Sequence, residues 1–159
     1  MKHLPKHLRP RWRYLAVGLE SWPDVHVSRS DFQRSVWFAA QNLLGDPGST
    51  DADLRVLQFE WGDGRGEAIV RARRGEVEPA RAALACIDSV RDDPIRVRVR
   101  GVSGTVRAGS EKYLGGPLEA EGEERVVFRN DSRRAIPRDG GVDVDHDGSF
   151  VGATRLDLE

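Results

Sequence analysis

This chain has little lysine, a single cysteine and no long apolar run among its 159 residues. One cysteine cannot form an internal disulfide, so a fold held by such cross-links is excluded. Cys86 lies in the apolar run AALACI and is expected to be buried. No stretch approaches the ~20 apolar residues that cross a bilayer, and no apolar segment of a secretory signal follows the basic amino terminus. We therefore expect one main domain in a cytoplasmic protein without a membrane partner.

The sequence also lacks the motifs of common catalytic sites. It contains no Walker loop, no nucleophile elbow and no Cys-x-x-Cys pair. Its four histidines lie in a basic arm or in expected loops, and its carboxylates show no spacing that singles out an acid and a base. We expect no catalytic residue, bound cofactor or metal site in the isolated chain. Whether the chain belongs to a larger enzyme stays open on these grounds.

The net charge of −1 hides an uneven distribution. Residues 1–114 carry 19 basic and 15 acidic side chains, whereas residues 115–159 carry 6 and 11. The first 14 residues hold five basic side chains and no acid, and 22 of the 25 basic residues are arginine. Arginine binds phosphate through two parallel hydrogen bonds, so this bias favours a polyanionic partner. A GC-rich genome or a salt-adapted host would produce the same bias, and both explanations can hold.

Apolar periodicity predicts the element order β-α-β-β-α-β followed by a short helix. A glycine-rich turn, GDGRG, joins the second and third strands as an antiparallel hairpin. This order is the ferredoxin-like split arrangement of the α+β class, an antiparallel sheet with two helices on one face. The expected strands are residues 11–20, 54–61, 67–73 and 95–100. The expected helices begin at Ser30 and end at Gly45 and Pro47, span residues 76–90, and lie within residues 101–114.

The chain divides into a basic arm (residues 1–10), a ferredoxin-like RNA- or protein-binding domain (11–114) and an acidic extension (115–159). The extension is expected to be disordered or weakly β. Its segment DVDHDG (Asp143–Gly148) imitates the start of a calcium loop, but position 12 is Thr154 instead of glutamate and no helix is expected before it. A solvated acidic tail is the simpler interpretation, and weak ion binding at Asp143–Gly148 stays open.

The segment IRVRVRGVSGTVRAGSEKYL carries the clearest functional signal. Its arginines alternate with apolar residues along the fourth strand, as they would on any half-exposed strand, so they contact either a partner or water. At the following helix entry, Ser103–Thr105, backbone N–H groups lack intrahelical partners and can receive an anion such as phosphate. Arg107 and Lys112 add positive charge nearby. We interpret this segment as a phosphate-binding turn, with RNA as the source of the phosphate.

The strand order is shared with the RNA-recognition motif, which stacks bases on aromatic residues of its third strand. Here the corresponding segment, RGEAIV, lacks both aromatic residues. Trp12 and Tyr14 on the first strand could still stack on bases, but packing in the core is the simpler explanation. We therefore expect RNA to be bound by charge and shape, without recognition of bases.

Three segments together resemble the Pop-five family of archaea and eukaryotes, the family of ribonuclease P protein component 2. They are the arm LPKHLRPRWRYLAV, the helix DFQRSVWFAAQNLLGDPG and the stretch RVRVRGVSGTVRAGSEKYL. The combination of an LPxxLRxxxRY arm, a helix ending in LLG and a GVSGT turn before a helix ending in KYL is specific. It covers about residues 1–114. The acidic extension resembles those of salt-loving archaea.

The resemblance implies a non-catalytic subunit of the ribonucleoprotein that removes 5′ leaders from precursor tRNA, in which the RNA subunit with magnesium hydrolyses the phosphodiester. It implies as partners the ribonuclease P RNA, the barrel-fold protein component 3 and other protein subunits, with indirect contact to precursor tRNA and self-association in a heterotetramer. A ferredoxin-like protein-interaction or small-ligand-binding domain without RNA is the alternative. Candidate RNA-binding residues, from the matching motifs and the neighbouring charges, are Lys2, Lys6, Arg9, Arg11, Arg13, Arg98, Arg100, Ser103, Gly104, Thr105, Arg107 and Lys112.

The last helix departs from the uniformly basic helix that the resemblance leads us to expect. It carries Gly109 and Glu111. We expect both residues to weaken its hold on phosphate, so Ser103–Arg107 is the stronger part of the candidate site.

Overall fold

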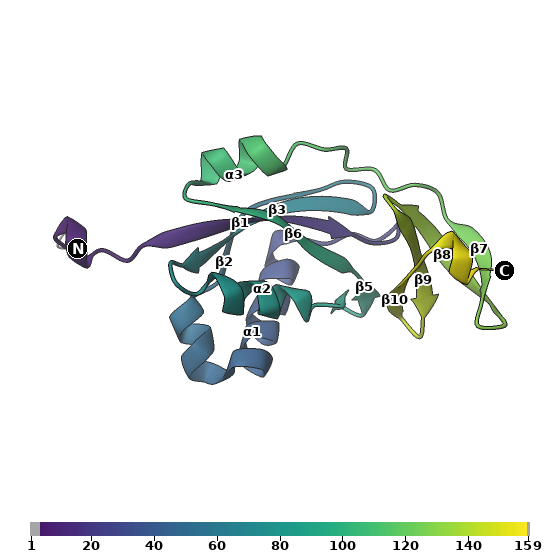
Figure 1. Cartoon of the computed structure of the whole chain (residues 1–159), viewed down its shortest axis with the longest axis horizontal. Helices are drawn as coiled ribbons and strands as arrows, with labels where there is room; N and C mark the ends of the chain where they lie inside the picture. Colours follow the sequence, from purple (N-terminus) through teal and green to yellow (C-terminus); the bar gives the residue numbers. More distant parts are fainter. Residues whose placement is uncertain (1–3, 159) are drawn as a thin grey trace.

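The computed structural model describes residues 4–158, which form two four-stranded antiparallel sheets placed end to end (Figure 1). The first sheet has the strand order β2-β3-β1-β6 and carries α1 and α2 on one face. This order confirms the ferredoxin-like α+β arrangement. Its elements are β1 (Trp12–Glu20), α1 (Arg29–Ala52), β2 (Arg55–Trp61), β3 (Arg65–Arg73), α2 (Val77–Ala85) and β6 (Arg96–Ser103).

The hydrophobic core lies between the first sheet and the helices α1 and α2. β1 is a central strand that pairs with both β3 and β6, and its residues Leu15, Val17 and Leu19 point towards the helices and are buried. Alternate residues of a strand point to opposite faces. Trp12 and Tyr14 therefore lie on the other face, half-buried and outside the core cluster. The expectation that these two side chains pack in the core is wrong.

α1 begins at a capping box, in which the Ser28 hydroxyl accepts a hydrogen bond from the Asp31 amide and the Asp31 carboxylate accepts one from the Ser28 amide. Hydrogen bonding to Ser28 is the main cause that lowers the pKa of Asp31 below its ordinary value. The first helical segment of α1 ends at Gly45, as expected. Gly45 adopts φ 71°, and the chain becomes helical again from Pro47 to Ala52. Proline suits the first turn of a helix, so a second helical segment, and not a loop, connects the break to β2.

α2 ends at Ala85, earlier than the expected Val90. The chain after it forms a short strand pair, β4 (Ser89–Val90) with β5 (Asp93–Pro94), around a turn of two residues with positive φ. Cys86 therefore lies at the end of the helix and is exposed, contrary to the expectation of burial. No helix within residues 4–158 combines the length and the apolar character that crossing a membrane requires.

β6 extends to Ser103, beyond the expected end at Arg100, because it pairs with β1 as far as Tyr14. Gly101 consequently lies inside the strand and not in a turn. A Cβ atom on Gly101 would lie 2.1 Å from the ring of Tyr113, so only glycine allows α3 (Val106–Tyr113) to lie this close to the sheet. α3 thus covers part of the face opposite α1 and α2 (Figure 1).

The acidic extension contains the second sheet, with strand order β10-β9-β8-β7. The sequence patterns allowed either disorder or weak β structure in this region. In the structure β7 pairs with β8, β8 with β9 and β9 with β10, all antiparallel. The sheet has a small hydrophobic cluster of its own. Its elements are β7 (Glu124–Phe128), β8 (Asp131–Arg138), β9 (Gly141–His146), β10 (Ser149–Ala153) and the short helix η2 (Arg155–Asp157).

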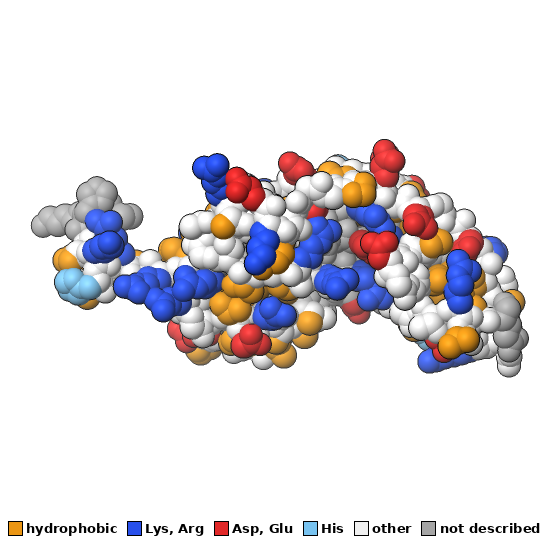
Figure 2. Space-filling model, turned by 45° about the horizontal axis from the view of Figure 1, so that its top comes forward, with side chains coloured by type: hydrophobic (Ala, Val, Ile, Leu, Met, Phe, Trp, Pro, Cys, Tyr) orange, Lys and Arg blue, Asp and Glu red, His pale blue; other side chains and the backbone are white. Residues whose placement is uncertain are grey.

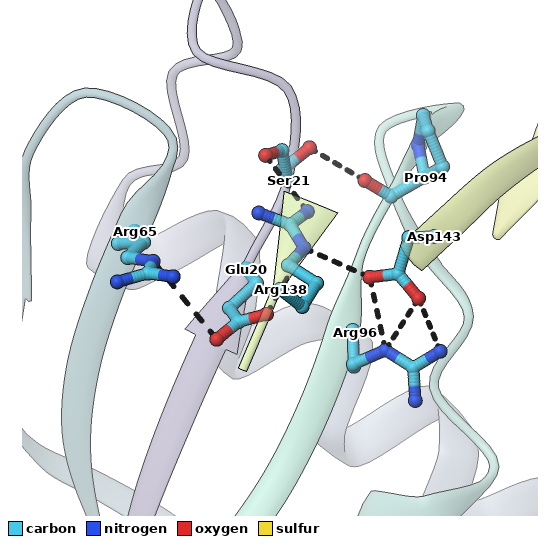
Figure 3. A network of polar contacts seen from close by, with 7 residues as sticks. All are labelled: Glu20, Ser21, Arg65, Pro94, Arg96, Arg138 and Asp143. Atoms are coloured by element: carbon cyan, nitrogen blue, oxygen red, sulfur yellow. Dashed lines mark hydrogen bonds and ion pairs between the residues drawn. The ribbon is translucent and has the colours of Figure 1, made fainter. Parts of the chain in front are cut away.

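Ion pairs fasten the second sheet to the end of the first (Figure 3). Asp143 of β9 is 1% exposed and accepts hydrogen bonds from Arg96 Nε, at 2.9 and 3.0 Å, and from Arg138 Nε, at 2.9 Å. Arg138 also lies 3.0 Å from the Glu20 carboxylate and donates to the Ser21 carbonyl oxygen at 3.1 Å. Hydrogen bonding to Asp143 raises the pKa of Arg96. A network of opposite charges therefore crosses the junction between the sheets.

The segment that imitates a calcium loop is the hairpin of β9 and β10. Asp143 points into the arginine network, whereas Asp145 accepts a hydrogen bond from the Gly148 amide at 3.1 Å. These carboxylates do not converge on one point. Across residues 4–158, no group of three or more His, Cys, Asp and Glu side chains is arranged to hold a metal ion.

Candidate nucleic-acid interface

The basic arm enters β1 at the end of the first sheet that lies away from the second sheet (Figure 1). Lys6 belongs to the short helix η1 (Lys6–Leu8), Arg9 donates to a backbone carbonyl within the arm, and Arg11 is exposed. Figure 2 shows Lys and Arg side chains along the arm and no acidic side chain beside them. Lys2 lies outside the described residues. The described arm is therefore a cationic extension of the sheet.

Arg13 connects the arm with the turn before α3. Tyr14 of β1 is the register partner of Ser103 of β6, which brings the start of one strand beside the end of the other. A Cβ atom on Gly104 would lie 3.8 Å from Arg13 Nη1. The arm and the GVSGT turn, which are separate segments of the sequence, thus meet at one surface.

The entry of α3 retains two free donors. The Thr105 hydroxyl accepts a hydrogen bond from the Ala108 amide at 3.1 Å, and the Ser103 hydroxyl accepts one from the Thr105 amide at 3.4 Å. The first four N–H groups of a helix have no intrahelical partner. Since side chains satisfy two of them, the amides of Val106 and Arg107 remain available to an anion.

The body of α3 presents less positive charge than its basic residues suggest. Arg107 Nε donates to Glu111 at 2.8 Å, with both side chains largely exposed, so Glu111 offsets the charge of Arg107. Gly109 is buried, and a Cβ atom there would lie 3.4 Å from the Cβ of Ser103. Gly109 therefore serves the packing of α3 on the sheet and does not interrupt a cationic surface. Lys112 lies 5.3 Å from the ring centre of Tyr113.

The arginines of β6 have different environments. Arg96 binds Asp143 across the junction between the sheets. Arg100 binds the buried carboxylate of Glu67 and donates to the Tyr113 carbonyl oxygen at 3.1 Å, so it holds the end of α3. Arg98 is exposed and makes no hydrogen bond or ion pair with any residue between 4 and 158. Of the two candidates on this strand, only Arg98 has its charge free, and it lies apart from the arm.

An aromatic and cationic surface beside the arm was not among the candidates. The guanidinium carbon of Arg71 lies 3.7 Å from the ring centre of Trp12, and that of Arg73 lies 5.6 Å from it. Both arginines come from β3, and Arg71 pairs in register with Tyr14 and with Arg55 of β2. Strand register determines this grouping. The alternation of Arg71 and Arg73 in the sequence indicated only that they share a face.

Comparison with known proteins places residues 13–114 in the Rpp14/Pop5 family. The chain is 63% identical to the ribonuclease P protein component 2 of Haloarcula marismortui, over 99% of both chains. It is 60% identical to the protein of that name from Halobacterium salinarum, over 99% of this chain and 96% of the relative. The protein of that name from Methanosarcina mazei is 40% identical over 114 residues, which are 72% of this chain and 93% of the relative.

The halophilic relatives match almost the whole chain. The match to the Methanosarcina relative is 114 residues long, which equals the combined length of the arm and the ferredoxin-like domain without the acidic extension. The family match begins at Arg13 in β1 and ends at Leu114 just after α3, so it includes Arg13 and the GVSGT turn, whereas Lys6, Arg9 and Arg11 precede it. With its ferredoxin-like sheet, its GVSGT turn and these relatives, this chain belongs to the Rpp14/Pop5 family.

Proposed function

We propose that this chain is a protein subunit of ribonuclease P that supports the RNA subunit in the removal of 5′ leaders from precursor tRNA. The RNA, with magnesium, performs the hydrolysis in this proposal. The protein supplies fixed cations that hold phosphates of the folded RNA. Its contribution is to stabilise the RNA fold and to orient it, without a catalytic residue of its own.

One observation supports the RNA-binding role most directly. Lys6 and Arg9 of the arm and Arg11 directly after it have no acidic partner within the described chain, whereas Arg96, Arg100 and three of the six arginines of the extension, Arg133, Arg134 and Arg138, do. Unpaired cations at the surface attract a polyanion over a distance set by the salt concentration. The arm, Arg13 and the open amides of α3 lie together and form the proposed phosphate-binding surface.

The proposal extends to the partners. Besides the RNA, we propose contact with protein component 3 and other protein subunits, indirect contact with precursor tRNA, and self-association within a heterotetramer. In this role the chain works in the cytoplasm.

A groove of about 890 Å³ lies between α1 and the segment after α2 and is lined by Trp37, Phe38 and Cys86. It is on the helical face, away from the proposed RNA surface.

The test is reconstitution of the cleavage reaction with ribonuclease P RNA and the other protein subunits. The variant R9A/R11A/R13A should need a higher magnesium concentration for half-maximal cleavage, because magnesium must then neutralise phosphates that the arm otherwise holds. Each lost phosphate contact lowers the slope of log affinity against log salt by about 0.7 to 0.9. The triple variant should therefore lower it by about 2 to 3 units.

The matched control is R125A/R129A/R155A, which removes the same charge from exposed positions of the extension. It should leave both the magnesium requirement and the salt slope near those of the unchanged protein. An unchanged requirement in the arm variant, or an equal shift in the control, would contradict the role of the arm.

A further inference from the structure

The strands β2, β3, β1 and β6 align four side chains in one row on the face that carries α3. The register pairs Arg55 with Arg71, Arg71 with Tyr14, and Tyr14 with Ser103. Directly opposite residues of neighbouring strands point to the same face. Trp12 lies on this face too, next to the row at the arm end of the sheet.

Arg71 is held by an aromatic ring and not by a counter-charge. Its guanidinium lies 3.7 Å from the ring centre of Trp12, and its Nε is buried without a hydrogen-bond partner. Within the described chain, Arg71 and Arg55 make no ion pair, although they face each other across the strands. Like charges in such a pair repel. The carboxylate of Asp53 lies 3.9 Å from Arg73, at the edge of the surface.

The indole of Trp12 differs from those of Trp37 and Trp61 in its bonding, and from that of Trp22, which is 4% exposed, in its accessibility. The N–H groups of Trp37 and Trp61 donate to backbone carbonyls at 2.8 and 2.9 Å. The Trp12 N–H donates to no residue between 4 and 158, and neither does the Tyr14 hydroxyl. An aromatic residue outside the core, with a free donor and a stacked cation, suits a flat ligand that also carries negative charge.

We propose that Trp12, Tyr14, Arg55, Arg71 and Arg73 form a stacking platform for an unpaired nucleotide. A base stacks against the Trp12–Arg71 pair, while the arginines and the adjoining arm hold its phosphates. Stacking accepts any base because each has a π-face, so the platform recognises single-stranded character and not sequence. This inference rests on the proposed RNA-binding function and adds to it a contact with bases that charge and shape do not provide.

The aromatic residues of the platform and the stacked Arg71 come from the two central strands of the sheet, the strands that carry the stacking residues in the RNA-recognition motif, and Arg55 adds a charge from the edge strand β2. Here both aromatic residues come from β1, and arginine takes the place of aromatic residues on β3. α3 packs over the neighbouring row, where Gly109 lies close to Ile69. The platform is therefore limited to the end of the sheet beside the arm, and room for few nucleotides is expected there.

The test compares two single-stranded RNA probes of about ten nucleotides, one of adenosines and one abasic, with the full chain at one salt concentration. The phosphates are the same, so the difference reports the bases. Stacking of one base should make the adenosine probe bind roughly 5- to 150-fold more tightly. Binding should also change the tryptophan fluorescence, and the Trp12→Phe variant should reduce that change.

Two variants assign the effect to the platform. Trp12→Ala should lower the affinity for the adenosine probe to that for the abasic probe. Arg71→Lys keeps the charge but loses the planar stack, so it should reduce the preference for bases and leave the salt dependence unchanged. The Arg71→Lys variant still tests the platform if the Trp12→Ala variant does not fold. Phe38→Ala, which removes a 67% exposed ring on α1, is the control and should keep the preference.

Equal, salt-dependent binding of both probes by the unchanged protein would overturn the platform and leave the proposed function standing. A preference for bases that survives both Trp12→Ala and Arg71→Lys would overturn it as well. Failure to bind either probe would again overturn it, and the magnesium requirement in the reconstituted reaction would then decide on the proposed function separately.

Discussion

Asp143 is the residue on which the attachment of the second sheet to the first depends most directly. It is 1% exposed and binds arginines from both sheets, Arg96 of β6 and Arg138 of β8 (Figure 3). The variant Asp143→Ala leaves both guanidinium groups without this carboxylate. We expect the second sheet to detach more readily, because the Arg96–Asp143 pair joins it to β6 and the Arg138–Asp143 pair holds Arg138 beside Glu20 of β1.

The magnitude follows from the burial of each partner. Removing one member of a buried ion pair costs about 3 to 5 kcal/mol. Arg138 is 6% exposed, but it keeps Glu20 at 3.0 Å, which reduces its loss. The side chain of Arg96 is 42% exposed, so water replaces its lost partner and its share is about 0 to 1 kcal/mol. We expect a total of about 2 kcal/mol in the free energy that holds the second sheet in place.

Hydrogen–deuterium exchange measures this change locally. A loss of about 2 kcal/mol corresponds to roughly 30-fold faster exchange of the amides of β9 and β10, with little change in β1 and β3. Fluorescence provides a second readout, since the ring of Trp22 lies 5.0 Å from that of Phe150. Because the Asp143 contacts are buried, the effect should persist at high salt, where exposed pairs are screened.

Asp131→Ala is the matched control, since it removes one carboxylate from the same sheet. Asp131 is 67% exposed and pairs with Arg133 at 3.1 Å, so we expect a change below about 0.5 kcal/mol that disappears at high salt. Exchange of β9 and β10 at the rate of the unchanged protein in Asp143→Ala would refute the reasoning. An effect of Asp131→Ala equal to that of Asp143→Ala would refute it too.

Two further changes test the packing of α3 and the start of α1. Gly101→Ala places a Cβ atom 2.1 Å from the Tyr113 ring and should lower the free energy of unfolding by about 1 to 3 kcal/mol in denaturant titration, whereas Gly116→Ala, with open space around it, should not. Asp31→Ala should cost about 1 kcal/mol by removing the capping box with Ser28. Because the pKa of Asp31 is lowered in the folded protein, its contribution is present above its ordinary pKa of about 3.9 and is lost as pH falls through the lower folded pKa. The unfolding free energies of variant and unchanged protein should therefore converge in acid, and a constant difference would contradict this assignment.

Local patterns were enough to predict the ferredoxin-like order of elements. The buried face of an element can be predicted from the spacing of its apolar residues. Every second residue is buried in Leu15, Val17 and Leu19, as in a strand, and the four-residue spacing of Phe32 and Val36 is that of a helix. The ends of elements were predicted less well. The chain after the break at Gly45 forms a second helical segment, and β6 continues to Ser103 because β1 pairs with it as far as Tyr14.

The candidate site was predicted in part for the same reason. The arm and the GVSGT turn are contiguous segments, so their charges and glycines could be read along the chain. The grouping of Trp12 with Arg71 could not, because it depends on the register of two strands. The roles of Arg96 and Arg100 also escaped prediction, since their partners Asp143 and Glu67 are distant in sequence.

The sequence by itself determined the class of fold, the family and the presence of an arm whose cations have no acidic neighbour along the chain. These properties depend on residue type and spacing, which are local. Only the tertiary structure decided which arginines are free and which are neutralised, because an ion pair forms wherever folding brings opposite charges together. It also decided that Trp12 lies outside the core, since strand register and the position of α3 determine which face of β1 stays open.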